Sequence, residues 1–194
     1  MKRYIVSLSI VFILAPFAGC ASPATEFYTL SSIPVVERPP RMAGPSVSIV
    51  FDPVTIPELV DRTQIVSKKT ENRVYIDDFA EWADPLESQI ARVLAVDLAQ
   101  LIPESTVSTS PLHADDDTYR VSIDVQTFDS EMGQSVTIAI SWSVKSPAPR
   151  KRITGRTVVR ELVSAPGYEA LVKAHSRALA SVATDIATAT RSMM

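Results

Sequence analysis

The chain has 194 residues, a formal net charge of −3 at pH 7 and a single cysteine, Cys20. This length suits one domain, and one cysteine excludes a disulfide within the chain. The mildly acidic charge argues against nucleic acid as a partner, because proteins that bind nucleic acid carry clustered positive charge. After the first twenty residues, no apolar run is long enough to span a bilayer.

The first twenty residues have the three-part layout of a secretory signal peptide. Lys2 and Arg3 supply positive charge, an almost purely apolar run extends from Tyr4 to Phe17, and small residues precede Cys20. The apolar run is too short for a comfortable membrane span of about 20 residues. The alternatives are an ordinary signal peptide with an incidental cysteine, or a short anchor helix.

Cleavage before Cys20 would make its thiol the first mature side chain and a target for acylation. The layout resembles the lipobox of bacterial lipoproteins, although Phe17 replaces the usual branched aliphatic residue. That resemblance implies a diacylglyceryl group on the sulfur and an acylated amine, and two or more acyl chains anchor a protein stably. Ala21 stands where an aspartate would favour the inner membrane, so the resemblance points to the inner face of the outer membrane. The predicted division is a signal peptide at 1–19, a lipidated tether at 20–25 and one domain at 26–194.

Short strands and turns are predicted between the tether and residue 80. Prolines and Gly44 make 31–45 an extended surface connection. Pro57 begins one predicted helical turn at 57–60. β-favouring residue types and alternation predict strands at 26–30, 46–51, 63–68 and 73–76, the last two as a hairpin.

Two helices are predicted, at 80–101 and 168–191. In the first, Asp84 is placed as the N-cap, Pro85 as the first helical residue and Glu87 as the second half of a capping-box-like pair. Each helix has one apolar stripe at helical spacing. The stripe residues are Leu86, Ile90, Val93, Leu94, Leu98 and Leu101 in the first helix, and Leu171, Val172, His175, Leu179, Val182 and Ile186 in the second.

The region between the helices alternates strongly between apolar and polar residues. Strands at 119–126, 136–144 and 150–163 predict an antiparallel meander with one wetted face. Gly155 marks either a bulge or a close backbone approach. The first helix, with a strand before it and a strand at 105–110 after it, predicts a β-α-β crossover and so at least one parallel pair. The predicted fold class is therefore α/β: a single domain with a mixed, partly antiparallel sheet covered by two main helices. Whether both helices share one face is left open.

No catalytic or cofactor motif is visible, since nucleophile-elbow, zinc-protease, Cys-x-x-Cys, P-loop and dinucleotide-binding patterns are all missing from the sequence. His175 lies on an apolar stripe, which favours a core histidine over a catalytic base. His113 precedes the acidic run 115–117, which favours a solvated turn over a cation site. The basic run 150–152 favours a charged strand end, with contact to lipid headgroups as the alternative. We therefore expect no metal, no cofactor and no enzymatic activity.

Motifs between residues 27 and 86 resemble one family. The segment from Pro57 to Val66, PELVDRTQIV, is similar to the pattern Pro-x-Tyr-Leu-Asp-Arg-x-Gln-Ile-Val. WADPL at 82–86 is similar to Trp-Ala-Glu-Pro-Leu, and FYTL at 27–30 fits a Phe/Tyr-Tyr-x-Leu opening. In this order and spacing the motifs resemble the ABC-type transport auxiliary lipoproteins, a family that includes the PqiC (YmbA) type. Leu59 departs from the pattern, because it replaces the usual aromatic residue.

The resemblance implies an outer-membrane-anchored periplasmic accessory of an ABC or MCE-type phospholipid transport system that maintains envelope integrity. The implied partners are an MCE-domain protein that spans the periplasm, its inner-membrane transporter, and membrane lipids through acylated Cys20. Leu59, Asp61, Arg62 and Trp82 are then expected to build a partner-facing or lipid-facing region. The alternative is structural, with hydrogen bonds at a turn for Asp61 and Arg62 and core packing for Trp82.

Two other classes of function stay open at this point. A structural or pilotin-like lipoprotein of another envelope complex would share the anchor and the lack of a catalytic set. A membrane-bound hydrolase would have to use His113 or His175 as its base. The sequence also leaves open the lipid, the direction of transport, the particular partner and whether the chain forms a homo-oligomer.

Overall fold

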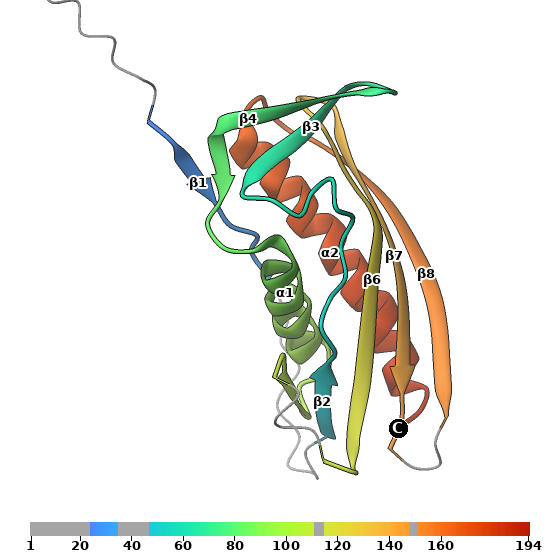
Figure 1. Cartoon of the computed structure of the whole chain (residues 1–194). Coiled ribbons are helices and arrows are strands. Elements are labelled where there is room, and N and C mark those ends of the chain that lie inside the picture. Colours follow the sequence, from blue (N-terminus) through green and yellow to red (C-terminus); the bar gives the residue numbers. More distant parts are fainter. Residues whose placement is uncertain (1–23, 35–46, 111–114, 148–150) are drawn as a thin grey trace, which may run out of the picture.

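The computed structural model describes residues 24–34, 47–110, 115–147 and 151–194. Cys20 with the predicted signal peptide, most of the proline-rich connection, His113 and Arg150 lie outside the described residues. The described chain forms one eight-stranded mixed sheet and two helices (Figure 1), which confirms the predicted α/β fold class. Within the same ranges, no helix is both long and apolar enough to cross a membrane.

The three longest strands lie in the second half of the chain. The strands are β1 (Glu26–Tyr28), β2 (Val47–Phe51), β3 (Gln64–Thr70), β4 (Arg73–Trp82), β5 (Ser105–Ser108), β6 (Thr118–Glu131), β7 (Ser135–Lys145) and β8 (Arg152–Leu162). The helices are α1 (Leu86–Leu101) and α2 (Tyr168–Arg191), and the bounds of α2 are those predicted. The predicted antiparallel meander is confirmed as β6, β7 and β8.

Strand β6 is the centre of the sheet. One of its edges pairs with β7, which pairs in turn with β8. Its other edge pairs in parallel with β2 near its start and, at its last residue Glu131, with Lys68 of β3. From there the sheet continues to β5 through β2, and to β4 and β1 through β3. β1 and β8 therefore end the sheet on opposite sides of β6 (Figure 1).

Two predictions about the first half were wrong. Residues 79–82 belong to β4, because the N–H of Trp82 pairs with the carbonyl of Thr63 in the sheet, so α1 begins at Leu86 and not at residue 80. The N-cap is Pro85, and no side chain caps the helix. The carboxylate of Asp84 instead accepts a hydrogen bond from Arg92, at 2.5 Å. The crossover was predicted in part: the parallel pair is confirmed, since β5 pairs with β2, but β4, the strand directly before the helix, does not pair with β5.

Both helices cover one face of the sheet. α2 packs on β7 and β8, and α1 packs on α2 and β5 (Figure 1). Val121, Ile123 and Val125 of β6 point to this side and are buried, whereas Ser122 and Asp124 between them are exposed. The predicted stripe of α2 is fully buried, including His175. The opposite side of β6, β7 and β8, here called the outer face, is the predicted wetted face.

Gly155 marks a close backbone approach and not a bulge. It pairs with Trp142, and the register runs without a shift along β7 and β8. A Cβ atom at position 155 would lie 2.3 Å from Cζ2 of the Trp142 ring. The indole Nε1 of Trp142 donates to the Oγ1 of Thr157 at 2.9 Å, and this hydroxyl donates to Asp185 of α2 at 2.6 Å. The missing side chain at Gly155 thus lets the indole lie over β8.

Candidate functional site

Three of the predicted site residues lie on one exposed turn between β2 and β3. The N–H of Val60 donates to the carbonyl of Pro57 at 3.0 Å, and the N–H of Arg62 donates to the carbonyl of Val60 at 2.9 Å. The side chain of Val60 is buried, so it holds the turn against the core. Leu59 is 44% exposed, and Asp61 and Arg62 are exposed. The turn therefore presents one apolar, one acidic and one basic side chain to solvent.

Asp61 and Arg62 do not hold the turn together through their side chains. Within the described part of the chain, neither side chain makes a hydrogen bond or an ion pair. The guanidinium of Arg62 is thus available for the planar two-donor contact that arginine makes with a carboxylate or a phosphate. Backbone hydrogen bonds and Val60 account for the shape of the turn without either charged group.

Trp82, the fourth predicted residue, is part of the core. It is 5% exposed, and its ring packs edge-on against Phe128 of β6, with ring centroids 6.3 Å apart. Its N–H donates to the carbonyl of Thr63 at 2.7 Å, and the N–H of Ala83 donates to Tyr28 of β1 at 2.8 Å. Trp82 therefore joins the end of the exposed turn to β1 and to the start of α1. It supports the region from within and does not project from it.

A cavity of about 260 Å³ brings Asp61, Arg62 and Trp82 together. Its lining consists of Asp61, Arg62, Thr63, Trp82, Ala83, Asp84, Pro85 and Leu86. Leu59 lies on the same turn but not in this lining. The volume is below the range of about 300–1,000 Å³ that small-molecule sites occupy. The cavity therefore suits a side chain of a partner better than a cofactor.

His175 has the environment of a core residue. It is fully buried, and its Nε2 lies 2.8 Å from the Oγ of Ser130. Burial lowers the pKa of His175 to about 3, so the ring is neutral at physiological pH. A base must reach the proton that it takes, and this ring has no exposed edge. His175 therefore offers no support for the hydrolase alternative.

The sequence interpretation missed a second polar region, which we call the N-terminal strap (Leu30–Ile33). Three of its backbone N–H groups are bound by side chains of the two helices. Leu30 donates to Gln89 of α1 at 2.8 Å, Ser31 to Ser176 of α2 at 3.1 Å, and Ile33 to Asp97 of α1 at 3.1 Å. Gln89 and Asp97 directly precede stripe residues of α1, at a spacing of eight residues. The two polar residues beside an apolar stripe are the sequence signal from which this contact could have been predicted.

Asp97 is the unusual member of this set. It is 3% exposed, and its second carboxylate oxygen has no hydrogen-bond partner among the described residues. Burial raises the pKa of Asp97 to about 6, against the opposing effect of the Ile33 N–H. The carboxyl group thus titrates near pH 6.

A larger cavity, of about 560 Å³, lies between the strap and α2. Phe27, which is 66% exposed, and Val172 are among its apolar lining residues. Its two basic residues are already paired, Lys173 with Glu169 at 2.5 Å and Arg177 with Glu161 at 3.1 Å. The cavity therefore offers apolar walls without an unpaired cation.

Comparison with known sequences places these features in one family. The family model described as the ABC-type transport auxiliary lipoprotein component matches residues 28–187, a range that includes all four predicted site residues. Two relatives are named "Intermembrane transport lipoprotein PqiC", one from Escherichia coli strain K12 and one from Shigella flexneri. Each is 23% identical over 194 residues, which cover 96% of this chain and 98% of the relative.

Solved structures with low sequence identity share the fold. The crystal structure of an uncharacterized protein has a TM-score of 0.72 at 18% identity and covers 86% of this chain and 99% of its own. A Xanthomonas campestris protein of the DUF330 family has a TM-score of 0.63 at 17% identity, and the match covers 86% of this chain and 94% of the other. These two similarities support the architecture of the sheet and helices alone.

Proposed function

Since the chain belongs to the ABC-type transport auxiliary lipoprotein family, we propose that it is a lipid-anchored, non-enzymatic adaptor of an ABC or MCE-type phospholipid transport system. The family match over residues 28–187 is the observation that carries the proposal. The names of the Escherichia coli and Shigella flexneri relatives, intermembrane transport lipoproteins, agree with it. In this role the chain works at the periplasmic face of the outer membrane and supports envelope integrity.

The anchor in this proposal is Cys20, exposed by removal of the signal peptide at 1–19 and then acylated. The tether that follows is short, since the five residues from Ala21 to Thr25 reach about 18 Å when fully extended. The domain at 26–194 is then held close to the membrane surface. A partner from the inner membrane must therefore span most of the periplasm to reach it.

The partner in this proposal is the periplasm-spanning MCE-domain protein, and its contact is the exposed turn with Leu59, Asp61 and Arg62. Two observations support the choice. The charged side chains of the turn make no contact within the described chain, and Leu59 is an exposed apolar side chain beside them. Trp82 takes the supporting position, because it fixes the backbone at the end of the turn.

The anchor is tested by intact-mass measurement and by separation of inner and outer membranes on a density gradient. The native chain should carry acyl groups and sediment with the outer membrane. The Cys20→Ala variant should lack them and appear in the soluble periplasmic fraction. Unmodified native protein would remove the anchor from the proposal.

The partner is tested by a photoreactive amino acid at position 59, with an MCE-domain protein expressed in the same cells. We expect a crosslink that Arg62→Ala and Asp61→Ala weaken. Arg73→Ala is the matched control, since Arg73 is an exposed arginine at the start of β4. A crosslink to a secretin in place of the MCE-domain protein would favour the pilotin-like alternative.

A further inference from the structure

Strand β8 is a long edge strand without a partner on its outer side. It has eleven residues and pairs only with β7 in the described part of the chain. The unpaired N–H and C=O groups of such an edge are a template for another strand. Figure 1 shows β8 on the opposite side of the sheet from β1, the strand nearest the N-terminus.

Three arginines share the outer face of this edge. Arg152, Arg156 and Arg160 are four residues apart, and side chains of a strand alternate between faces, so all three point the same way. All three are exposed. The other face of β8 carries Gly155 and Thr157, which lie against Trp142 and α2.

Two of the three arginines of this row make no contact with an acidic group among the described residues. Arg152 is paired in register with Lys145, a second cation, and among the described residues Arg152 makes no ion pair. Arg156 donates to the amide oxygen of Gln126 at 2.9 Å and not to a carboxylate. The outer faces of β7 and β8 hold no aspartate or glutamate, although the whole chain has a net charge of −3.

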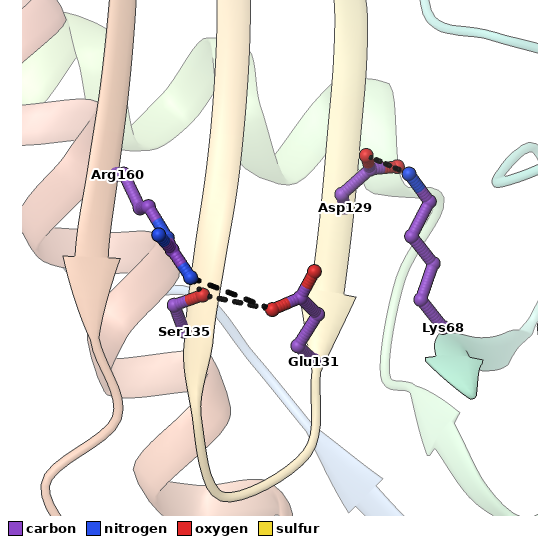
Figure 2. Close-up of polar contacts among 5 residues, drawn as sticks. All are labelled: Lys68, Asp129, Glu131, Ser135 and Arg160. Carbon is purple, nitrogen blue, oxygen red and sulfur yellow. Dashed lines mark hydrogen bonds and ion pairs between the residues drawn. The ribbon is translucent and has the colours of Figure 1, made fainter. Parts of the chain in front are cut away.

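Arg160 is the one arginine of the row with an acid within reach. Figure 2 shows it extending across β7, where its Nε donates to the Oγ of Ser135 at 3.1 Å. Its guanidinium lies 3.7 Å from the carboxylate of Glu131 on β6, and the side chain is still 65% exposed. This single long contact leaves most of the arginine open to a further carboxylate.

An added strand beside β8 would also contact apolar side chains on both faces of that strand. Val158 and Leu162 lie between and beyond the arginines on the outer face and are 56% and 72% exposed. On the helix-covered face, Ile153 and Val159 are half-buried at the margin of the core. Side chains of an added strand would extend the core beside them if they were apolar.

One register of pairing with a second copy of β8 is opposed by charge. An antiparallel pair centred on Arg156 would set that arginine against itself and Arg152 against Arg160. Like charges placed directly opposite each other in a sheet are destabilising. The arginines thus disfavour this self-pairing and attract an acidic strand, and specific interfaces combine repulsion and attraction in this way.

We propose that β8 is the docking edge for an extended acidic segment of a partner protein, which adds to the sheet as a further strand. The segment carries aspartate or glutamate at every fourth position, opposite Arg152, Arg156 and Arg160, and apolar residues on its other face. This surface is separate from the turn with Leu59, Asp61 and Arg62. It rests on the proposed function only in that an adaptor requires a partner.

The test uses the mature chain in detergent and a fluorescent nine-residue peptide in which glutamate alternates with valine. We expect the peptide to bind, with the affinity lowered at least tenfold by Arg156→Glu and unchanged by Arg73→Glu, a matched charge reversal. A peptide with lysine in place of glutamate should not bind. Two further peptides carry N-methyl groups on one or the other set of alternate amides, and one of the two should lose binding because strand pairing needs those N–H groups.

Four results would overturn the proposal. Equal weakening by Arg73→Glu would mean unspecific charge attraction, and full binding by both N-methylated peptides would exclude strand addition. Competition by anionic phospholipid vesicles for the same arginines would make this a membrane surface. Self-association abolished by Arg156→Glu in sedimentation experiments would make it an interface between copies. None of these depends on the crosslink at position 59, so the adaptor function and this edge can fail separately.

Discussion

The imidazole ring of His175 lies flat on the ring of Phe128, with centroids 4.0 Å apart and planes only 4° from parallel. The same phenylalanine packs edge-on against Trp82, so one ring of β6 joins α2 to the end of β4. The Nδ1 atom of His175 has no hydrogen-bond partner among the described residues. Burial lowers the pKa of this imidazole, so the ring is neutral in the folded chain at physiological pH.

His175 should make the fold sensitive to acid. Its pKa of about 3 in the folded chain lies below the unfolded value near 6.5. The unfolded state therefore binds the extra proton between these values, and stability is lost as the pH falls from about 6.5 towards 3, by at most about 1.4 kcal/mol per unit. Urea unfolding from pH 7 to pH 4 measures this loss.

The double variant His175→Phe with Ser130→Ala should flatten that part of the profile, because it removes the titrating ring and the hydroxyl that the ring binds. His175→Phe alone is the control, since it leaves the Ser130 hydroxyl buried without its partner. Parallel profiles for the native chain and the double variant would show that His175 does not set the acid limit.

Asp97 should act in the opposite direction. Its folded pKa, about 6, lies above the ordinary aspartate value of 3.8, so the folded state keeps the proton to higher pH. Its contribution to stability is therefore largest below pH 4 and declines as the pH rises to about 6. Asp97→Asn keeps an acceptor for the N–H of Ile33 and removes the charge. We expect the variant to gain roughly 1–3 kcal/mol relative to the native chain between pH 4 and pH 7. A constant difference in unfolding free energy over this range would contradict the assignment.

Gly155→Ala should destabilise the fold by about 1–3 kcal/mol, the usual consequence of overpacking. The new methyl group would meet the Trp142 ring at 2.3 Å, and the ring is held by its hydrogen bond to Thr157. Gly133→Ala is the control, since nothing lies within 4 Å of a Cβ there and only the positive φ of 68° opposes the change. Similar unfolding midpoints for the Gly155 variant and the native chain in urea would show that the indole can move aside.

Substitutions of Arg62 and Trp82 should have very different effects on the free energy of unfolding. Trp82→Ala should lower the free energy of unfolding by about 3–5 kcal/mol, as large-to-small changes of buried aromatic residues do. Arg62→Ala should change it by less than about 0.5 kcal/mol, because an exposed side chain without contacts contributes little. Thermal unfolding of both variants decides this, and a large loss for Arg62→Ala would assign that arginine a structural role.

Local patterns predicted the elements whose partners are close in the sequence. The stripe from Leu171 to Ile186 was enough for α2, and alternation was enough for the β6–β8 meander. The start of α1 was missed because other groups compete for the residues that were expected to begin the helix. Arg92 takes the carboxylate of Asp84, and the sheet takes the backbone of Trp82.

Long-range contacts were beyond the sequence patterns. The pairing of β2 with both β5 and β6 joins segments far apart in the chain, and nothing in VSIVF specifies its neighbours. For the candidate site, the motif placed Leu59, Asp61 and Arg62 on a turn, which the structure contains. The burial of Trp82 could not be predicted in this way, because the ring packs against Phe128, 46 positions later in the sequence.

β1 and the N-terminal strap determine how the domain would resist a pulling force applied to its N-terminal end. A pull on the chain ahead of β1 acts along that strand and is borne by its parallel hydrogen bonds to β4 together. Force transmitted beyond β1 reaches Gln89 and Asp97 of α1 and Ser176 of α2. It is therefore shared by two helices and does not peel a single strand from the sheet. With the proposed anchor at Cys20, these contacts would hold the domain folded when a bound partner pulls on it.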